Sequence, residues 1–438
     1  MLTSGKRNTA LYNIAAMNKG ASVAKLYSYT VPLKSDLLNT YCVLQKGFTD
    51  QFVYYRKDRP QRYLGLGRCI AIASREDLDH VLQGEVALPT VMFSFNRFDA
   101  SNPKPADEMM QAFPRLRLMI PEVVLIENEQ GCFLQVNSLG PVYKGRVERF
   151  LRHANDAPMR ERRSIRYSVV PDSYEAWEEE MRSTLSLIKA GRVKKLVPSR
   201  RQAVVATAPF SPKDVLLNLI DGKAQGTVFL YRYGDVFFCG CTPELLVRKQ
   251  GCQVESMCLA GTAAIGSTPE EREQFATFLM NDEKNRREHD CVVRFIREVF
   301  ERNCYDVDIP ADPTILPLKH VQHLYTPARA CVMEGVSIFS LMEQLHPTPA
   351  LAGQPVGEAL MSLREIESYN RGFFGGAVGV VDAEDNGEFS VAIRSGVFDG
   401  EAGWIYAGCG VVEGSDPREE FNEIDMKFET ILSAFQGE

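Results

Sequence analysis

The stretch Tyr406–Lys427, with the sequence YAGCGVVEGSDPREEFNEIDMK, combines the end of a strand, a glycine-containing turn and the first half of a helix. Ser415–Pro417 is a typical helix start, because Asp caps free N–H groups of the first turn and proline suits the first helical position. Glu420, Glu423 and Lys427 follow at spacings that place them on one helical face. This face suits a negatively charged ligand held through a metal ion, although Glu423 and Lys427 would also make an ordinary surface ion pair.

The composition predicts a globular protein. The chain has 438 residues, 45% of them apolar, which is enough for one large domain or two to three ordinary ones. The net charge of −7 comes from interspersed charges, without the basic surface that nucleic acid binding requires. No run of 18 or more apolar residues exists, so we expect no membrane span. Eleven cysteines without framework spacing favour reduced thiols acting as small apolar fillers, and a cytoplasmic location.

Strands and helices alternate irregularly along the chain. We expect a strand over 195–205, a hairpin of 226–233 with 235–241, one helix or a helix pair over 269–303, and three successive strands over 375–412. This order predicts an α+β fold, with large antiparallel sheets packed as a sandwich and flanking helices, rather than a doubly wound parallel sheet.

The arginine-rich stretch His153–Arg166 contains little apolar material and is interpreted as a connection between two subdomains. Residues 1–165 would form a divergent N-terminal subdomain without a chemical signature. Residues 166–438 would form the catalytic subdomain, and both would belong to one intertwined fold.

Glu288 falls on the buried stripe of the helix expected over 282–300, in line with Val292 and Val299. A buried carboxylate must be paired, protonated or bound to a metal, because an isolated ionised one is very costly. Lys284 is the expected local partner if the role is structural. Carboxylate oxygens such as those of Glu288, Glu420 and Glu423 are the hard donors that Mg²⁺ prefers.

Apolar and small residues alternate in the strand expected over 388–397, so Arg394 falls on a face with room for a ligand. An arginine there favours bidentate capture of a carboxylate, with an internal salt bridge as the alternative. His320 and His323 lack the helical context and the thiolates of a zinc site, and are interpreted as structural or substrate-contacting.

Taken together, the motifs of the chain resemble those of the chorismate-utilising enzymes, which include isochorismate, salicylate, anthranilate and aminodeoxychorismate synthases. The resemblance runs from about residue 170 to 435. It rests on nine segments in the family's order, namely Lys195–Arg200, Thr242–Leu246, Leu259–Thr262, Glu288–His289, Val321–Leu324, His346–Ala350, Arg371–Gly372, Ala392–Ser395 and Gly408–Lys427.

The resemblance implies a reaction and its proton carriers. Lys195 would take a proton from water as it attacks C2 of chorismate, while Glu244 would protonate the departing C4 hydroxyl. In the family, lysine at the position of Lys195 marks enzymes that add water rather than ammonia, so no glutaminase subunit is expected. His346–Ala350 is similar to the same segment of isochorismate synthases, and implies an isomerase that makes isochorismate.

The resemblance also implies the ligands of the substrate and of Mg²⁺. Glu288 and Glu423 would hold the ion, with Glu420 close by or acting through water. The expected substrate contacts are Gly261, Thr262, His323, Ala350, Leu351, Arg394, Gly408, Gly410 and Lys427.

A salicylate synthase, which eliminates pyruvate after forming isochorismate, is the alternative. Two positions depart from the family pattern, since Phe373–Phe374 stands where relatives have Trp-Tyr and Cys409 replaces a small alanine. The sequence leaves open whether the product enters menaquinone, siderophore or salicylate synthesis.

Overall fold

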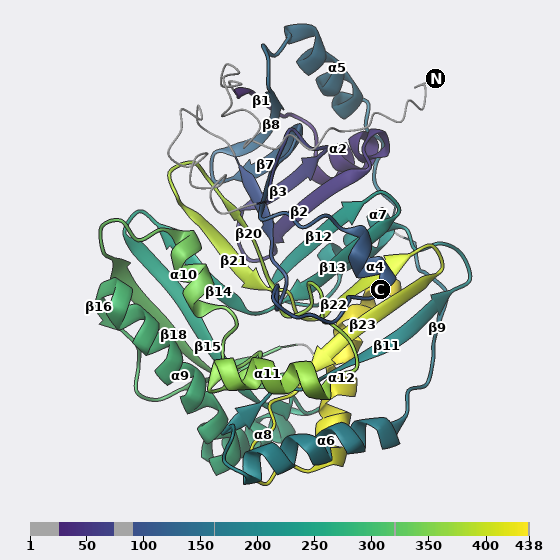
Figure 1. Cartoon of the computed structure of the whole chain (residues 1–438). Helices are drawn as coiled ribbons and strands as arrows, with labels where there is room; N and C mark the ends of the chain where they lie inside the picture. The colour runs from purple at the N-terminus through teal and green to yellow at the C-terminus, as the bar shows by residue number, and fades with distance from the viewer. Residues whose placement is uncertain (1–25, 74–90, 162, 319–320, 437–438) are drawn as a thin grey trace.

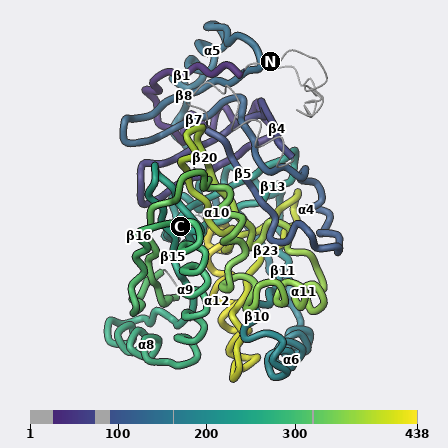
Figure 2. Tube along the Cα trace, turned by 60° about the vertical axis from the view of Figure 1, so that its left-hand side comes forward, coloured from purple at the N-terminus to yellow at the C-terminus, as the bar shows by residue number. Residues whose placement is uncertain are grey.

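The structure is a computed structural model and describes residues 26–73, 91–161, 163–318 and 321–436 (Figure 1). In this part of the chain, two large sheets face each other and helices cover their outer sides (Figures 1 and 2). All strand pairs of both sheets are antiparallel. The predicted α+β sandwich is confirmed.

The first sheet, called sheet A, joins strands from the beginning, the middle and the end of the chain. In spatial order its described strands are β1 (Tyr27–Pro32), β8 (Gly131–Ser138), β7 (Val123–Asn128), β3 (Arg62–Leu66), β2 (Asp50–Arg56), β12 (Thr227–Tyr233), β13 (Val236–Thr242), β22 (Ser395–Asp399), β23 (Ala402–Gly408), β11 (Ser199–Ala206) and β9 (Tyr167–Val169). The predicted hairpin is present as β12 and β13.

The second sheet, called sheet B, is assembled in the same mixed way. Its described strands run in the order β16 (Cys304–Asp308), β18 (Val321–Val332), β15 (Gln253–Ala264), β14 (Leu245–Gln250), β21 (Gly387–Val391), β20 (Ala377–Val381), β5 (Met92–Phe95), β6 (Leu118–Ile120) and β4 (Ile70–Ile72), with β17 (Thr314–Pro317) also on β18. A small pair, β10 (Lys195–Leu196) and β19 (Gly353–Gln354), lies apart from both sheets.

Three apolar clusters hold these layers together. The cluster between the sheets is aromatic and includes Phe52 and Tyr231 from sheet A and Phe93 from sheet B. A second cluster lies between sheet A and its helices, and a third between sheet B and its helices. Alternate residues of each strand therefore point to different cores, one between the two sheets and one between the sheet and its helices.

The helices divide between the two outer faces. Those whose buried residues join the core of sheet A are α2 (Leu37–Leu44), which a 3₁₀ turn at Gln45–Gly47 follows, α5 (Lys144–Asn155), α6 (Tyr174–Lys189), α7 (Pro212–Asp221) and α12 (Pro417–Gln436). Those that join the core of sheet B are α9 (Glu283–Asn303), α10 (Ile338–Leu345) and α11 (Val356–Ile366). The short α4 (Glu108–Ala112) contributes to the inter-sheet core, and α8 (Pro269–Asn281) precedes α9.

Helix α12 begins where the sequence predicts. Asp416 Oδ1 accepts hydrogen bonds from the backbone N–H groups of Arg418 and Glu419, at 2.9 and 3.0 Å. These bonds satisfy two donors that the first helical turn leaves free. Pro417 opens the helix, as its fixed φ and missing N–H allow.

Two predicted strands are interrupted. The expected strand over 195–205 is divided at Val197 and Pro198 into β10 and β11. The expected strand over 388–397 ends at Val391 and resumes at Ser395, and Arg394 between them has φ +55°. Consequently four strands, rather than three, occupy 375–412, because this break takes the chain from sheet B to sheet A. The placement of Arg394 within a regular strand is therefore wrong.

Strands from residues 1–165 and from 166–438 occur in both sheets, and β2 pairs directly with β12. The functional division at residue 165 stays a prediction. In the described part of the chain, no helix is both long and apolar enough to cross a membrane.

Candidate active site

A cavity of about 700 Å³, its mouth included, opens between the edges of the two sheets, α9 and α12. Eleven predicted residues line it, namely Glu244, Gly261, Thr262, Glu288, His323, Ala350, Leu351, Arg394, Gly408, Gly410 and Lys427. The cavity brings together segments that lie up to 230 positions apart in the sequence, from Val197 to Lys427.

Two segments that cross between the sheets carry Glu244 and Arg394. The chain passes from β13 to β14 through Pro243 and Glu244, and returns from β21 to β22 through Arg394. The crossings lie side by side, since Val391 N–H donates to the Glu244 carbonyl at 3.0 Å and Cys241 N–H donates to the Arg394 carbonyl at 3.3 Å. The left-handed backbone of Arg394 is uncommon for a residue with a side chain, and such strain concentrates at functional sites.

Glu244 has the properties of a proton donor. Its side chain is buried, and burial raises the pKa of its carboxyl to about 7, although Arg394, Lys195 and Lys427 act in the opposite direction. A carboxyl with such a pKa is partly protonated at neutral pH and can release its proton to a leaving group.

Lys195 lies beneath the cavity wall and is completely buried. Its Nζ is 2.9 Å from Oε1 of Glu288, an ion-pair distance that is not accompanied by an aligned hydrogen bond. Gly410 makes this contact possible, because a Cβ at that position would lie 2.0 Å from Glu288 Oε1 and 2.9 Å from Lys195 Cε. The prediction that Lys284 is the partner of Glu288 is wrong, since α9 turns Glu288 towards a strand that lies 93 residues earlier in the sequence.

The three predicted metal ligands each face a lysine. Lys284 Nζ is 2.6 Å from Glu420 Oε1, Lys427 Nζ is 2.6 Å from Glu423 Oε1, and Glu288 faces Lys195. Burial and the nearby Glu423 raise the pKa of Glu420. Burial also opposes ionisation of Glu423, but Lys427 outweighs it and lowers the pKa. The Glu423–Lys427 pair is therefore real, but it is a buried wall contact rather than a surface one.

These carboxylates have the donor chemistry that Mg²⁺ prefers, and Glu288 and Glu423 both lie near enough to raise the pKa of Glu420. In the described ranges, however, no three His, Cys, Asp or Glu side chains are gathered closely enough to hold a metal ion. The lysine contacts account for this arrangement. To coordinate an ion, the carboxylates must turn away from their lysines.

A bulge in β15 shapes the side of the cavity near His323. The strand pairing with β18 shifts between Ala260 and Thr262, so Gly261 has no partner and adopts φ +78°. The Thr262 N–H, predicted to bind the substrate, donates instead to Asn285 Oδ1 at 3.0 Å. His323 Nδ1 is 3.1 Å from the Gly261 carbonyl, whereas Nε2 has no partner among the described residues. Burial, with Arg394 and Lys427, lowers the pKa of His323 to about 3, so the ring is neutral. His320 lies outside the described residues.

Arg394 and Lys427 give the cavity positive charge. Burial lowers the pKa of Arg394 to about 10, while Glu423 and Glu244 favour its charged form, so the guanidinium stays protonated at neutral pH. Lys427 Nζ also donates to the Gly408 carbonyl at 2.7 Å, which ties α12 to the end of β23. Cations in a buried cavity attract carboxylates strongly, because little water screens them.

The two departures from the family pattern have different surroundings. Phe374 lines the cavity and stacks on Tyr406 with 5.3 Å between ring centroids, whereas Phe373 points into the aromatic core between the sheets. Position 374 therefore contributes a ring without a hydroxyl. Cys409 is buried beside Glu420, and burial followed by this carboxylate holds the pKa of its thiol above the usual value.

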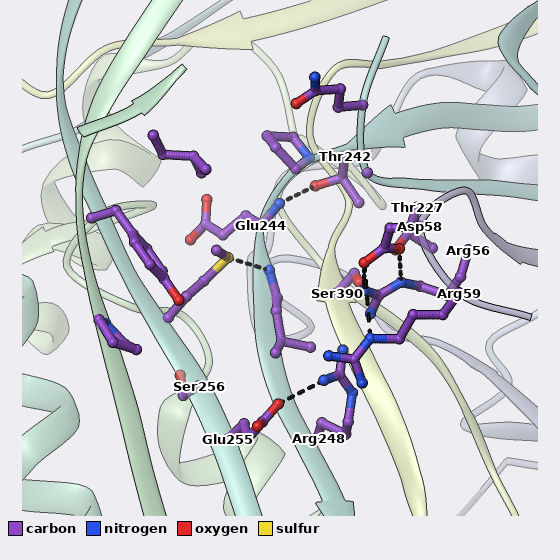
Figure 3. Close-up of a pocket in the computed structure, with 18 of the residues that line it drawn as sticks. Arg56, Asp58, Arg59, Thr227, Thr242, Glu244, Arg248, Glu255, Ser256 and Ser390 are labelled. Carbon is purple, nitrogen blue, oxygen red and sulfur yellow. Dashed lines mark hydrogen bonds and ion pairs between the residues drawn. The ribbon is translucent and has the colours of Figure 1, made fainter. Parts of the chain in front are cut away.

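A second, larger cavity of about 1000 Å³, its mouth included, also has Glu244 among its lining residues (Figure 3). Arginines line it, but Arg56 is paired with Asp58 and Arg248 with Glu255. Glu244 is the single predicted site residue among its lining residues. Because Pro243 and Glu244 line both cavities, they form the partition between them.

Three predicted residues, Lys195, Glu420 and Glu423, do not line the main cavity but contact residues that do or lie behind them. The sequence analysis gave no role to Asn285, whose Oδ1 accepts the hydrogen bond of the Thr262 N–H, or to Arg371, which lines the cavity. Arg371 belongs to a recognised motif, but its partners come from distant segments that periodicity does not connect.

A comparison with protein families identifies the family of the chain. The model for the chorismate binding enzymes matches residues 13–436, nearly the whole chain. The protein therefore belongs to the chorismate binding enzyme family.

Two relatives show how far the similarity extends. The isochorismate synthase MenF of Bacillus subtilis is 39% identical over 262 residues, which are 60% of this chain and 56% of that protein, so the match spans little more than half of its length. The salicylate biosynthesis isochorismate synthase of Pseudomonas aeruginosa is 32% identical over 369 residues, covering 82% of this chain and 76% of that protein.

Solved structures share the fold. The menaquinone-specific isochorismate synthase MenF of Escherichia coli has a TM-score of 0.79 at 23% identity, over 94% of each chain. Component I of anthranilate synthase from Streptococcus pneumoniae has a TM-score of 0.67 at 18% identity, over 98% of this chain and 95% of that one. At these identities the likeness concerns the fold alone.

Proposed function

We propose that this protein is an isochorismate synthase, an isomerase that converts chorismate to isochorismate. The observation that carries the proposal is one cavity lined by Glu244, a carboxyl with a pKa of about 7, and by Glu288, whose carboxylate is 2.9 Å from the buried Lys195. The names of its relatives support the same activity.

The cavity suits a small ring with two carboxylates. The Arg394 guanidinium donates hydrogen bonds to the enolpyruvyl carboxylate, and the positive charge of Lys427 attracts the ring carboxylate. His323 is neutral and offers an Nε2 lone pair once Nδ1 donates to the Gly261 carbonyl, so it can accept a hydrogen bond from a substrate hydroxyl. Ala350, Leu351 and Phe374 supply the apolar surface that the ring contacts.

The reaction divides between the two proton carriers. Lys195 takes a proton from water as the water oxygen forms a bond to C2, and the ring double bonds shift. The C4–O bond breaks, and Glu244 donates its proton so that the hydroxyl leaves as water. Positioned proton transfer of this kind contributes roughly 10²- to 10⁴-fold to the rate for each carrier. One water enters and one leaves, so the reaction is an isomerisation.

Lys195 accepts its proton as the neutral amine, so before the next turnover Lys195 must release a proton and Glu244 must regain one. Glu244 also lines the larger cavity, whose lining residues are drawn in Figure 3. We assign this cavity the role of the aqueous path that restores the proton and removes the departing water.

Glu288, Glu420 and Glu423 would hold Mg²⁺, which supplies positive charge against the ring carboxylate as the π-system shifts. Lys195, Lys284 and Lys427 pair with these carboxylates and compensate their charge.

Dialysis against EDTA is expected to abolish turnover, and addition of Mg²⁺ is expected to restore it. Activity that survives EDTA would contradict a magnesium requirement.

Product analysis tests the proposed activity. The protein is incubated with chorismate and Mg²⁺, with and without ammonia, and the products are separated by chromatography. Isochorismate alone supports the proposal. Salicylate with pyruvate would select a salicylate synthase, anthranilate formed with ammonia would select an aminating enzyme, and no turnover would favour a binding protein.

Two variants test the assigned roles. Lys195→Ala and Glu244→Gln are each expected to lower turnover by at least about 100-fold while the circular dichroism spectrum is retained. Unchanged activity in a folded variant would refute the role of that residue.

A further inference from the structure

Arg371 is the most completely bonded cation in the cavity wall. Its side chain is only 3% exposed, and all three of its nitrogens donate within the protein. Nη1 donates to the Leu351 carbonyl at 3.0 Å, Nη2 donates to the Val197 carbonyl, and Nε donates to Glu367 at 2.9 Å. With its fork engaged in this way, Arg371 is not free to bind a substrate carboxylate bidentately.

Glu367 completes the arrangement from the opposite side. Its Oε1 accepts hydrogen bonds from the Ser199 N–H at 2.9 Å and the Ser199 hydroxyl at 2.6 Å. That hydroxyl is also 2.8 Å from the Tyr369 hydroxyl. The Phe98 ring lies 4.3 Å from the Arg371 guanidinium carbon and closes one face of the pair.

The segments that this pair joins hold predicted site residues. Val197 and Ser199 flank the break between β10 and β11, two and four residues after Lys195. Leu351 lines the cavity beside Ala350. The two segments also contact each other, through the Val197 N–H and the Ala352 carbonyl at 3.0 Å. One guanidinium therefore spans both walls at the point where regular sheet pairing is interrupted.

We infer that Glu367 and Arg371 form a buried clamp whose task is positional: it fixes the segment after Lys195 against Ala350–Leu351. Arg371 and Glu367 are positioning residues rather than catalytic ones. The inference deepens the proposed function and rests on it only for its consequence on turnover. That the clamp holds the two backbone segments together does not depend on the proposed function.

The test uses Arg371→Lys and Glu367→Gln. Lysine keeps the positive charge beside Glu367 but cannot donate to both carbonyls, so this variant separates geometry from charge. Arg364→Lys is the matched control, since Arg364 on α11 makes a comparable two-point contact with Asp99, at 2.7 and 2.8 Å, and does not line the cavity. Hydrogen exchange read by mass spectrometry follows the amides of 195–199 and 350–352, and steady-state kinetics with chorismate follows turnover.

In both clamp variants, exchange of these two segments is expected to rise at least tenfold. The kcat is expected to fall at least tenfold with KM within about threefold of wild type, because small misplacements of reacting groups cost rate more than binding. The control is expected to change neither. Wild-type exchange in both segments would overturn the clamp, and faster exchange with unchanged kcat would overturn its positional role. If the wild-type protein does not turn over chorismate, the exchange result still decides the clamp, and only the proposed function fails.

Discussion

At the scale of single residues, the surroundings of a carboxyl rather than its residue type decide its charge in this cavity. Burial raises the pKa of Glu244, whereas Lys427 lowers the pKa of the partly buried Glu423. A carboxyl that is partly protonated at neutral pH and one that is ionised thus lie close to the same cavity. The same separation of carboxyl roles by environment is common in acid–base enzymes.

The pH dependence of turnover follows from Glu244. Its pKa is about 7, so the protonated donor is abundant below pH 7 and lost above it. We expect kcat/KM for chorismate to fall about tenfold for each pH unit above roughly 8, measured in buffers of constant ionic strength. A profile that stays flat from pH 6 to 9 would contradict Glu244 as the acid.

Burial of Glu244 is also expected to make the free energy of unfolding depend on pH. The folded-state pKa of Glu244 lies above the ordinary value of 4.5, so its favourable contribution is complete below pH 4.5 and is lost as the pH rises through 7. Glu244→Gln is therefore expected to raise the free energy of unfolding by about 3 kcal/mol at pH 8.5 and by little at pH 4.5. Urea denaturation at the two pH values measures this difference, and an equal effect at both would contradict it.

Gly410 tests the contact between Lys195 and Glu288. An alanine methyl at this position would overlap Glu288 Oε1, so Gly410→Ala must displace that side chain. We expect turnover to fall at least tenfold while the protein remains folded, measured by the chorismate assay and circular dichroism. Gly357→Ala is the control, because a methyl there meets no atom within 4 Å. Wild-type activity of Gly410→Ala would show that the pair is not required.

At the scale of elements, the sequence predicts correctly those helix starts and turns that depend on only a few neighbouring residues. The cap at Asp416 and the hairpin of β12 and β13 were predictable because turn and cap chemistry act over a few residues. The break at Arg394 was not, since apolar alternation continues through it and the left-handed backbone leaves no periodic signal. The partner of Glu288 was missed for a related reason, as it depends on two distant segments meeting.

The cap of α12 gives a prediction at this scale. Asp416→Ala removes the acceptor of two backbone N–H groups and is expected to lower the free energy of unfolding by about 1 kcal/mol. Denaturant unfolding measures the change, with Glu429→Ala as the control in an exposed, non-capping position of the same helix. An equal loss in both variants would show that the cap contributes nothing specific.

At the scale of the whole molecule, an ionic network joins the two sheets. Glu388 on β21 accepts from Arg56 Nη1 and the Tyr54 hydroxyl on β2, each at 2.6 Å, and from Arg248 Nε on β14 at 2.5 Å. Strands β2 and β21 come from opposite ends of the chain, and of the residues in this contact Tyr54 also belongs to the apolar core between the sheets. The early and late parts of the sequence are therefore expected to unfold together.

Glu388→Gln tests this coupling. Removing the charge takes one of two carboxylate partners from each arginine, since Arg56 keeps Asp58 and Arg248 keeps Glu255, and a change of this kind costs about 1 to 3 kcal/mol. Calorimetry is expected to show one transition, shifted to lower temperature, because both sheets lose the same tie. Glu384→Gln, on the exposed turn nearby, is expected to leave the transition unchanged. A variant that unfolds in two separate steps would disprove the single cooperative unit.

The neighbouring crossings that bear Glu244 and Arg394 have one further consequence. The proposed proton donor and the proposed carboxylate ligand lie on two crossings that are hydrogen-bonded to each other. The distance between the two groups is therefore set by this local contact rather than by the packing of the outer helices. We expect substitutions in the remaining walls to change the cavity without changing this distance.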